Sequence, residues 1–214
     1  IETRTVSKLE GSRLLVSVDS WPAYAPYPLG HFVRILGKNG DKDVETAVLL
    51  HEFDVPHSAF TAEVMACLPP AGWSITPEEV SRRADLRHIP VVSIDPPGCK
   101  DIDDALHCTR LSNGRYEAGV HIADVTHFVS PDSALDIEAA RRATSTYLVE
   151  RRLDMLPGLL TTELCSLRSK EDHLAFSVLW EMDEEGNIHD VKFTKSVIHS
   201  VASLTYDQAQ VMLD

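Results

Sequence analysis

The 214-residue sequence has no apolar run approaching the roughly 20 residues that a membrane-spanning helix needs, which excludes that class of protein. Its opening residues, IETRTVSKLEG, lack both a basic start and an apolar block, so they do not resemble a secretory signal. The first residue is not Met, and the last ten residues follow a helical pattern that is cut short. We therefore expect the chain to be part of a longer protein.

Cysteine is scarce, and the four that are present contain no C-x-x-C pair and no spacing that suits zinc. Without a secretory signal, the sequence predicts reduced thiols in an intracellular protein. The cysteines are Cys67, Cys99, Cys108 and Cys165.

Positive charge is also in short supply, with 20 basic residues against 33 acidic ones and a net charge of −13. A negative surface repels phosphate, so charge alone argues against general nucleic-acid binding. It leaves room for a local basic track or for a carboxylate site neutralised by divalent cations. Hydrophobic residues make up 43% and charged residues 25%, as in ordinary globular proteins.

The first 70 residues have the pattern of short strands separated by long loops. Strands are predicted over 14–19 and 31–36, with a turn at 38–41 and a proline-rich loop over 21–30 between them. This pattern is typical of a partial OB-type barrel. The loop aromatics could stack on bases or pack under their own loop; these are Trp21, Tyr24 and Tyr27.

A helical linker is predicted over 71–90. A further helical stretch precedes it at 58–68. Thr76 and Pro77 form a strong helix start, and Glu79 completes the pattern of a capping box. We expect this helix to continue through Arg87 and to stop before Pro90.

From residue 91 the pattern changes to α+β. A buried-type strand over 91–95 ends in an acid, and two hairpins are predicted, over 104–123 and 174–201. Between them we expect a long helix that begins at Ser130–Pro131 and runs through residue 148. A short helix follows residue 158, and Thr205 caps the last one.

The sharpest feature is a run of aspartates that follows the strand over 91–95. Pro96, Pro97 and Gly98 can turn the chain back sharply. If the next residues are extended, alternate side chains point the same way, so the carboxylates converge. Such crowding is repulsive unless cations lie between the groups. The aspartates are Asp95, Asp101, Asp103 and Asp104.

Carboxylate oxygens in this number suit Mg²⁺ or Mn²⁺, and two such ions can drive phosphodiester hydrolysis. The alternative is a solvated acidic turn whose aspartates only cap backbone groups. An EF-hand is excluded, because the spacing has no Gly at the sixth position and no closing Glu.

Several motifs in order carry a family resemblance: SIDPPGCKDIDDAL at 93–106, GVHIADVTHFV at 119–129 and TYLVERRLDMLPGLLTTELCSL at 146–167. Together they resemble the catalytic domain of the ribonuclease II/R (RNB) family. The wording DPPGCxDIDDALHC, the WEM at 180–182 and KFTKSVI at 192–198 resemble members that work with the eukaryotic RNA exosome. The segment 19–37 resembles a second cold-shock domain of the OB type.

The resemblance implies an α+β fold in three parts: a partial cold-shock domain over 1–70, a linker over 71–90 and the front of an RNB domain over 91–214. It implies hydrolytic 3′-to-5′ degradation of single-stranded RNA to nucleoside 5′-monophosphates. The four aspartates would bind one or two Mg²⁺, with Mn²⁺ as a substitute, and loss of Asp103 would abolish hydrolysis. Tyr147 would stack near the RNA 3′ end.

The same resemblance implies partners and a location. Single-stranded RNA and exosome core subunits are the expected partners, and neither DNA nor a membrane is. The expected location is the nucleus with its nucleolus, and in addition the cytoplasm. The family's domain extends beyond residue 214 and there supplies a catalytic arginine, so whether this chain alone is active stays open.

Basic residues flank Tyr147 on both sides. A basic region around an aromatic is what a single-strand channel needs, although arginine pairs on helix faces commonly bind acids such as Glu138 and Glu150. His121 and His127 lie on either side of Asp124, which is compatible with a general-base role. His121 lies on a strand with alternating apolar and polar residues, where a buried, hydrogen-bonded histidine is expected, so neither is predicted to be catalytic. The RNA-binding candidates are Arg141, Arg142, Arg151 and Arg152.

Overall fold

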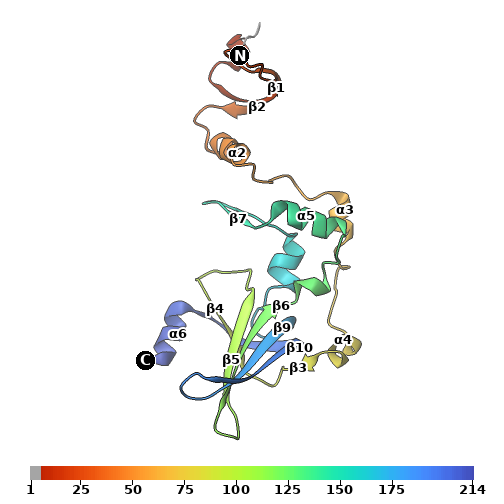
Figure 1. Cartoon of the computed structure of the whole chain (residues 1–214), viewed down its shortest axis with the longest axis vertical. Coiled ribbons are helices and arrows are strands. Elements are labelled where there is room, and N and C mark those ends of the chain that lie inside the picture. The colour runs from red at the N-terminus through yellow and green to blue at the C-terminus, as the bar shows by residue number, and fades with distance from the viewer. Residues whose placement is uncertain (1–5) are drawn as a thin grey trace. The chain divides into compact units, whose positions relative to one another are not determined.

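The computed structural model describes residues 6–214 and has the mixed α+β architecture that the sequence predicts (Figure 1). The chain divides between Ala59 and Phe60 into two compact units, which we describe separately. The domain limits expected at residues 70 and 90 stay predictions. None of the helices in the described residues is long and apolar enough to cross a bilayer.

The first unit is built on one antiparallel strand pair. Strand β1 (Ser12–Ser20) pairs with β2 (Leu29–Lys38), and the ladder is interrupted by three register shifts. Both predicted strands and the loop between them are confirmed. Within the described residues of this unit the pair forms a two-stranded sheet, in keeping with a partial barrel. A short helix, α1 (Val6–Leu9), precedes the pair.

Helix α2 (Lys42–Glu52) follows β2 and has no counterpart in the sequence-based prediction. Residues 38–41 do turn, but the turn ends in a helix cap. The Asp41 side chain accepts hydrogen bonds from the backbone N–H groups of Asp43 at 3.0 Å and Val44 at 3.2 Å. Two donors of the first helical turn are thereby satisfied, which stabilises the helix start.

Two short helices form here: α3 (Ala62–Ala66), within the helical stretch predicted at 58–68, and α4 (Pro77–Ser81), within the predicted linker. Thr76 caps α4 as predicted, because its Oγ1 accepts from the Glu79 N–H at 3.2 Å. The prediction that this helix runs through Arg87 is wrong. Beyond Ser81 the chain turns inward and the Arg83 side chain is buried, and strand β3 (Ala84–Asp85) pairs in parallel with β10 (Ile188–Thr205).

A curled sheet forms the centre of the second unit. Its strand order is β3-β10-β4-β5-β6-β9, and β10 also pairs with β9, so the ring of strands returns to β10. The long strand β10 makes this possible: residues up to His199 pair with β9, and residues from Ser200 pair with β4. The predicted strand and both hairpins are confirmed. The strands are β4 (Val91–Asp95), β5 (Asp104–Arg110), β6 (Tyr116–Ala123), β9 (Asp172–Met182) and β10 (Ile188–Thr205).

The predicted long helix at 130–148 is wrong at both ends. Helix α5 (Ala134–Arg142) starts after Ser133, whose Oγ accepts from the Asp136 N–H at 3.2 Å. It stops at Ala143, which has a φ of 62°. The residues beyond form a hairpin of two short strands, β7 (Thr146–Tyr147) and β8 (Arg152–Leu153), in which Tyr147 lies opposite Arg152.

Helix α5 and the β7 strand lie at one end of the sheet, where Figure 1 shows them above the tips of β4, β5 and β6. Leu135 of α5 and Leu160 of the following segment are fully buried in the core, together with Leu167, Val91 and Ile198. This packing fixes the position of the hairpin that carries Tyr147. The remaining segments are η1 (Val125–His127), η2 (Leu159–Leu164) and α6 (Tyr206–Leu213).

Candidate active site

The acidic loop between β4 and β5 is anchored to the segment that follows η2. Gly98 supports the reversal with a φ of 82°, a conformation that disfavours other residue types. The Ser166 hydroxyl donates to the Lys100 carbonyl at 2.9 Å and accepts from the Ile102 N–H at 3.2 Å. Ile102 is buried, so its two neighbours, Asp101 and Asp103, project together on the other side.

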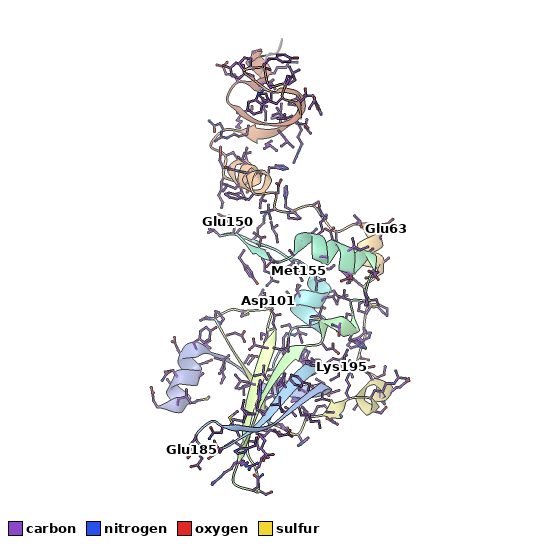
Figure 2. The ribbon with its side chains drawn as sticks, in the orientation of Figure 1. Glu63, Asp101, Glu150, Met155, Glu185 and Lys195 are labelled. Atoms are coloured by element: carbon purple, nitrogen blue, oxygen red, sulfur yellow. The ribbon has the colours of Figure 1, made fainter. Side chains whose placement is uncertain are left out.

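Asp101 and Asp103 line the same cavity, of about 400 Å³, as their alternation in the sequence predicts. Tyr147 and Asp154 contribute polar groups to its wall, and η2 supplies apolar side chains such as Leu160. Figure 2 shows Asp101 close to Met155, another residue of this wall, between the tips of the strands and the hairpin.

Negative charge is concentrated around Asp103. Its burial, followed by the charges of Asp101 and Asp104, raises the pKa of Asp103 above its usual value. The charge of Arg152 opposes this shift without cancelling it. The site therefore favours any group that brings positive charge to Asp103.

Asp101 differs from Asp103 in having two polar partners. Its carboxylate accepts a hydrogen bond from the Tyr147 hydroxyl at 3.1 Å and forms an ion pair with Arg152. Burial raises the pKa of Asp101, but the Tyr147 hydrogen bond and the Arg152 charge outweigh it and hold that pKa below its usual value. Asp101 is therefore ionised and oriented by these two residues at neutral pH.

The chemistry of these donors fits a divalent cation such as Mg²⁺. Four carboxylates lie on the acidic loop and at the ends of the two strands that flank it, and Oδ2 of Asp95 is buried with no hydrogen-bond partner among the described residues. In the present arrangement, no three His, Cys, Asp or Glu side chains within residues 6–214 stand close enough together to hold an ion. The loop thus supplies suitable ligands, which would have to draw closer to share one cation.

Comparison with known proteins decides the family. The RNB domain family matches residues 83–214, and the Dis3-like cold-shock domain 2 family matches residues 1–54. The chain belongs to the RNB family. It is 58% identical, over 214 residues, to the exosome complex exonuclease RRP44 of Mus musculus and 56% identical to that of Homo sapiens. Each match covers 100% of this chain and 22% of the relative, so the chain spans about a fifth of these proteins.

Solved structures support the same fold. Mycoplasma genitalium RNase R in complex with ribose-methylated single-stranded RNA matches with a TM-score of 0.84 and 25% identity. That match covers 95% of this chain and 31% of the other. Yeast Ssd1, described as a pseudonuclease, matches with a TM-score of 0.82 and 22% identity over 98% of this chain and 26% of its own, which shows the fold alone.

The predicted RNA-binding residues of the RNB domain differ in their exposure and in their binding partners. Tyr147 is 69% exposed at the hairpin, while Arg141 is exposed but bound to Glu138 at 2.8 Å. Arg142 is buried, bound to Glu138 at 2.8 Å and stacked 3.9 Å from the Phe60 ring centre, and its contact with RNA stays a prediction.

The other two arginines lie on the β7–β8 hairpin. Arg151 is exposed, whereas Arg152 is bound to Asp101 and Asp154. The sequence analysis missed two residues of this site, Asp154 and Ser166. The R-x-D spacing of Arg152 and Asp154 could have indicated their pairing, whereas nothing near Ser166 indicates its contact with a loop 64 residues away.

The histidines and the loop aromatics are also placed by the structure. His121 is fully buried and hydrogen-bonded, as predicted, and lies within the sheet. Trp21, Tyr24 and Tyr27 are 66%, 91% and 78% exposed, and the Trp21 indole N–H donates to the Ala25 carbonyl of the same loop at 3.2 Å.

Proposed function

We propose that this chain is part of a divalent-metal-dependent exoribonuclease that hydrolyses single-stranded RNA from its 3′ end and releases nucleoside 5′-monophosphates. The observation that carries the proposal is the shared cavity, in which two loop carboxylates lie beside an exposed tyrosine ring. Membership of the RNB family and the similarity to exosome exonucleases support it.

In this proposal Asp95, Asp101, Asp103 and Asp104 hold one or two Mg²⁺, with Mn²⁺ as a substitute. A bound ion supplies Lewis acidity, which neutralises charge on the scissile phosphate and lowers the pKa of water. Asp103 is the residue whose loss is most damaging, because it lies where negative charge is most concentrated. Ser166 holds the backbone of the loop in place.

Tyr147 is assigned to the 3′-terminal base. Its ring is 69% exposed on the hairpin beside the acidic loop, where a terminal base can reach it. Stacking of a base on such a ring contributes about 1–3 kcal/mol and tolerates every base. We therefore expect weak sequence preference, with Arg141 and Arg151 contributing charge near the RNA.

The names of the relatives extend the proposal to partners and location. RRP44 of mouse and human are named as exosome complex exonucleases. We infer that the complete protein binds exosome core subunits and works in the nucleus, including the nucleolus, and in the cytoplasm.

Direction and metal dependence are tested with one assay. Single-stranded RNA labelled at its 5′ end should give a ladder of shortening products, and RNA labelled at its 3′ end should give labelled mononucleotide at once. EDTA should stop both. The complete protein and this chain are assayed side by side. Internal cleavage, or activity that survives EDTA, would contradict the proposal.

The role of Asp103 gives a specific prediction. Asp103→Asn in the complete protein should reduce turnover by about a thousandfold or more, since it removes a charge at the reacting centre. RNA affinity, measured by fluorescence anisotropy, should change by no more than about twofold. Asp190→Asn, at an exposed position of β10, is the matched control and should have wild-type turnover. Near-normal turnover of Asp103→Asn would refute the assigned role.

The second candidate is a non-catalytic RNA-binding or docking module with a structural acidic loop. It is favoured by one observation: within residues 6–214 the acidic side chains are not gathered for metal binding. Titration with Mn²⁺, followed by NMR signals of the four aspartates, separates the two. No site-specific response at millimolar metal would favour the module.

A further inference from the structure

The guanidinium of Arg152 occupies the place next to Asp101 that a divalent cation would need. One end of the guanidinium forms an ion pair with Asp101, and the Nε side forms another with Asp154. The three side chains are only 19–24% exposed, so these charges are poorly screened by solvent. Arg152 is thus a tethered cation that already neutralises one carboxylate of the acidic loop.

The same arginine is part of the hairpin that presents Tyr147. Arg152 and Tyr147 are directly opposite each other in the β7–β8 ladder, and the guanidinium carbon lies 6.0 Å from the centre of the tyrosine ring. Both side chains bind the same oxygen, Oδ2 of Asp101. Asp101 therefore holds the hairpin against the acidic loop through two contacts that share one acceptor.

A carboxylate oxygen that accepts from Tyr147 and pairs with Arg152 has little capacity left for a metal ion. A divalent cation at Asp101 would also be repelled by the guanidinium, because two positive charges a few ångströms apart are strongly unfavourable in a partly buried site. Binding of an ion at Asp101 and docking of Arg152 on the same carboxylate accordingly oppose each other.

We propose that Arg152 is a positioning residue that competes with the divalent cation for Asp101, so that metal binding loosens the β7–β8 hairpin from the acidic loop. This inference rests on the metal site of the proposed function. It assigns no chemical step to Arg152. Asp154 keeps the guanidinium close by when Asp101 is released, which makes the exchange reversible.

The test measures metal affinity without RNA and without turnover. Mn²⁺ binding to the complete protein is followed by electron paramagnetic resonance, and Asp101→Asn identifies the signal that belongs to this site. Arg152→Gln should bind Mn²⁺ about fivefold to a hundredfold more tightly than the wild type, the size expected for removing one nearby charge. Arg152→Lys, which keeps the charge, should stay within about threefold of the wild type.

Arg151→Gln is the matched control, because it removes the same charge one residue away, where the side chain is exposed. It should change Mn²⁺ affinity by less than about twofold. A second measurement follows the hairpin itself: in the wild type, Mn²⁺ should speed up amide hydrogen exchange in residues 146–153. In Arg152→Gln, exchange there should be fast with or without metal.

The possible outcomes are distinct. Unchanged or weaker Mn²⁺ affinity in Arg152→Gln overturns the competition but leaves the metal site standing. Absence of any Mn²⁺ signal sensitive to Asp101→Asn, in the wild type and in Arg152→Gln alike, overturns the metal site and the inference with it. Slower exchange of the hairpin on metal addition also overturns the inference, since it would mean that metal and Arg152 act together.

Discussion

At the scale of single residues, a chain of hydrogen-bonded polar side chains, most of them buried, crosses three strands of the second unit, β5, β6 and β9. Nδ1 of His107 and Nε2 of His121 are 2.8 Å apart, and Nδ1 of His121 is 2.7 Å from Oγ of Ser177. Nε2 of His107 faces the Glu117 carboxylate at 3.3 Å. With Glu117 ionised, both rings can be neutral only if Ser177 donates to His121, His121 to His107 and His107 to Glu117.

Space for this pair of rings depends on Gly119. A Cβ at Gly119 would lie 2.1 Å from Cε1 of His107, and the His107 ring cannot move without breaking its hydrogen bonds. Glycine is therefore required at position 119 by packing against the His107 ring and not by a turn. From the sequence, His121 could be predicted to be buried and hydrogen-bonded, but its partners could not, because they come from strands that meet only in the folded sheet.

The His121 ring predicts how stability depends on pH. Burial, followed by the charge of His107, lowers its pKa from 6.5 to about 4. The unfolded chain therefore binds more protons between these values, so the free energy of unfolding falls as pH is lowered from about 6.5 to about 4. The expected loss is about 3 kcal/mol, measured by urea unfolding monitored through tryptophan fluorescence.

His121→Gln should flatten this part of the pH profile. If His121→Gln does not fold, the wild-type ring can be titrated directly by NMR. A His121 that protonates near pH 6.5 in the folded protein would show the prediction to be wrong.

At the scale of secondary-structure elements, the linker is fastened to the sheet by one buried arginine. Arg83 follows α4, and its guanidinium contacts Asp124 at 2.7 Å and Glu79 at 2.5 Å, with only 3% of the side chain exposed. Asp124 is also buried and has a further contact with Lys195 at 3.0 Å. These contacts explain why the helix ends where it does: continued helical geometry would carry Arg83 away from Asp124.

Arg83→Gln should destabilise the second unit by about 3–5 kcal/mol, because it leaves Asp124 buried with only part of its compensating charge. Amide exchange should rise in residues 76–85 and 124–127. Arg82→Gln is the neighbouring control; its side chain is 68% exposed and bound to Glu78, so its cost should not exceed about 1 kcal/mol. Equal effects of the two substitutions would rule out the fastening role.

The elements also show how far local sequence signals reach. The strands on either side of the acidic loop and the loop itself could be predicted, because alternation and the Pro-Pro-Gly turn are encoded locally. Helix α2 was missed because Asp41 acts both as the end of a turn and as a helix cap. The length of α5 was overestimated because Ala143 adopts a left-handed conformation that nothing nearby demands. Because of that error, the hairpin that brings Tyr147 and Arg152 to Asp101 was not predicted.

At the scale of the whole molecule, charge would limit how the RNA that we propose as substrate can bind. The net charge is −13, and the arginines near the acidic loop are mostly engaged: Arg142 with Glu138, and Arg152 with Asp101. Phosphates approaching the loop would therefore meet negative charge that exposed cations such as Lys100 and Arg151 offset only in part. Divalent ions held by the aspartates would reverse this balance locally, while the rest of the surface continues to repel RNA.

This predicts an unusual response of RNA binding to salt. For this chain alone, the dissociation constant for a single-stranded RNA should be about 10 µM or weaker at 150 mM salt, and NaCl should weaken binding only slightly, because few phosphates are neutralised. Millimolar Mg²⁺, which as a competing counterion ordinarily weakens binding to RNA, should strengthen it here. Fluorescence anisotropy with and without Mg²⁺ checks the sign. The double substitution Asp101→Asn with Asp103→Asn should abolish this gain in affinity. If Mg²⁺ instead weakens wild-type binding as NaCl does, the aspartates do not recruit cations for RNA.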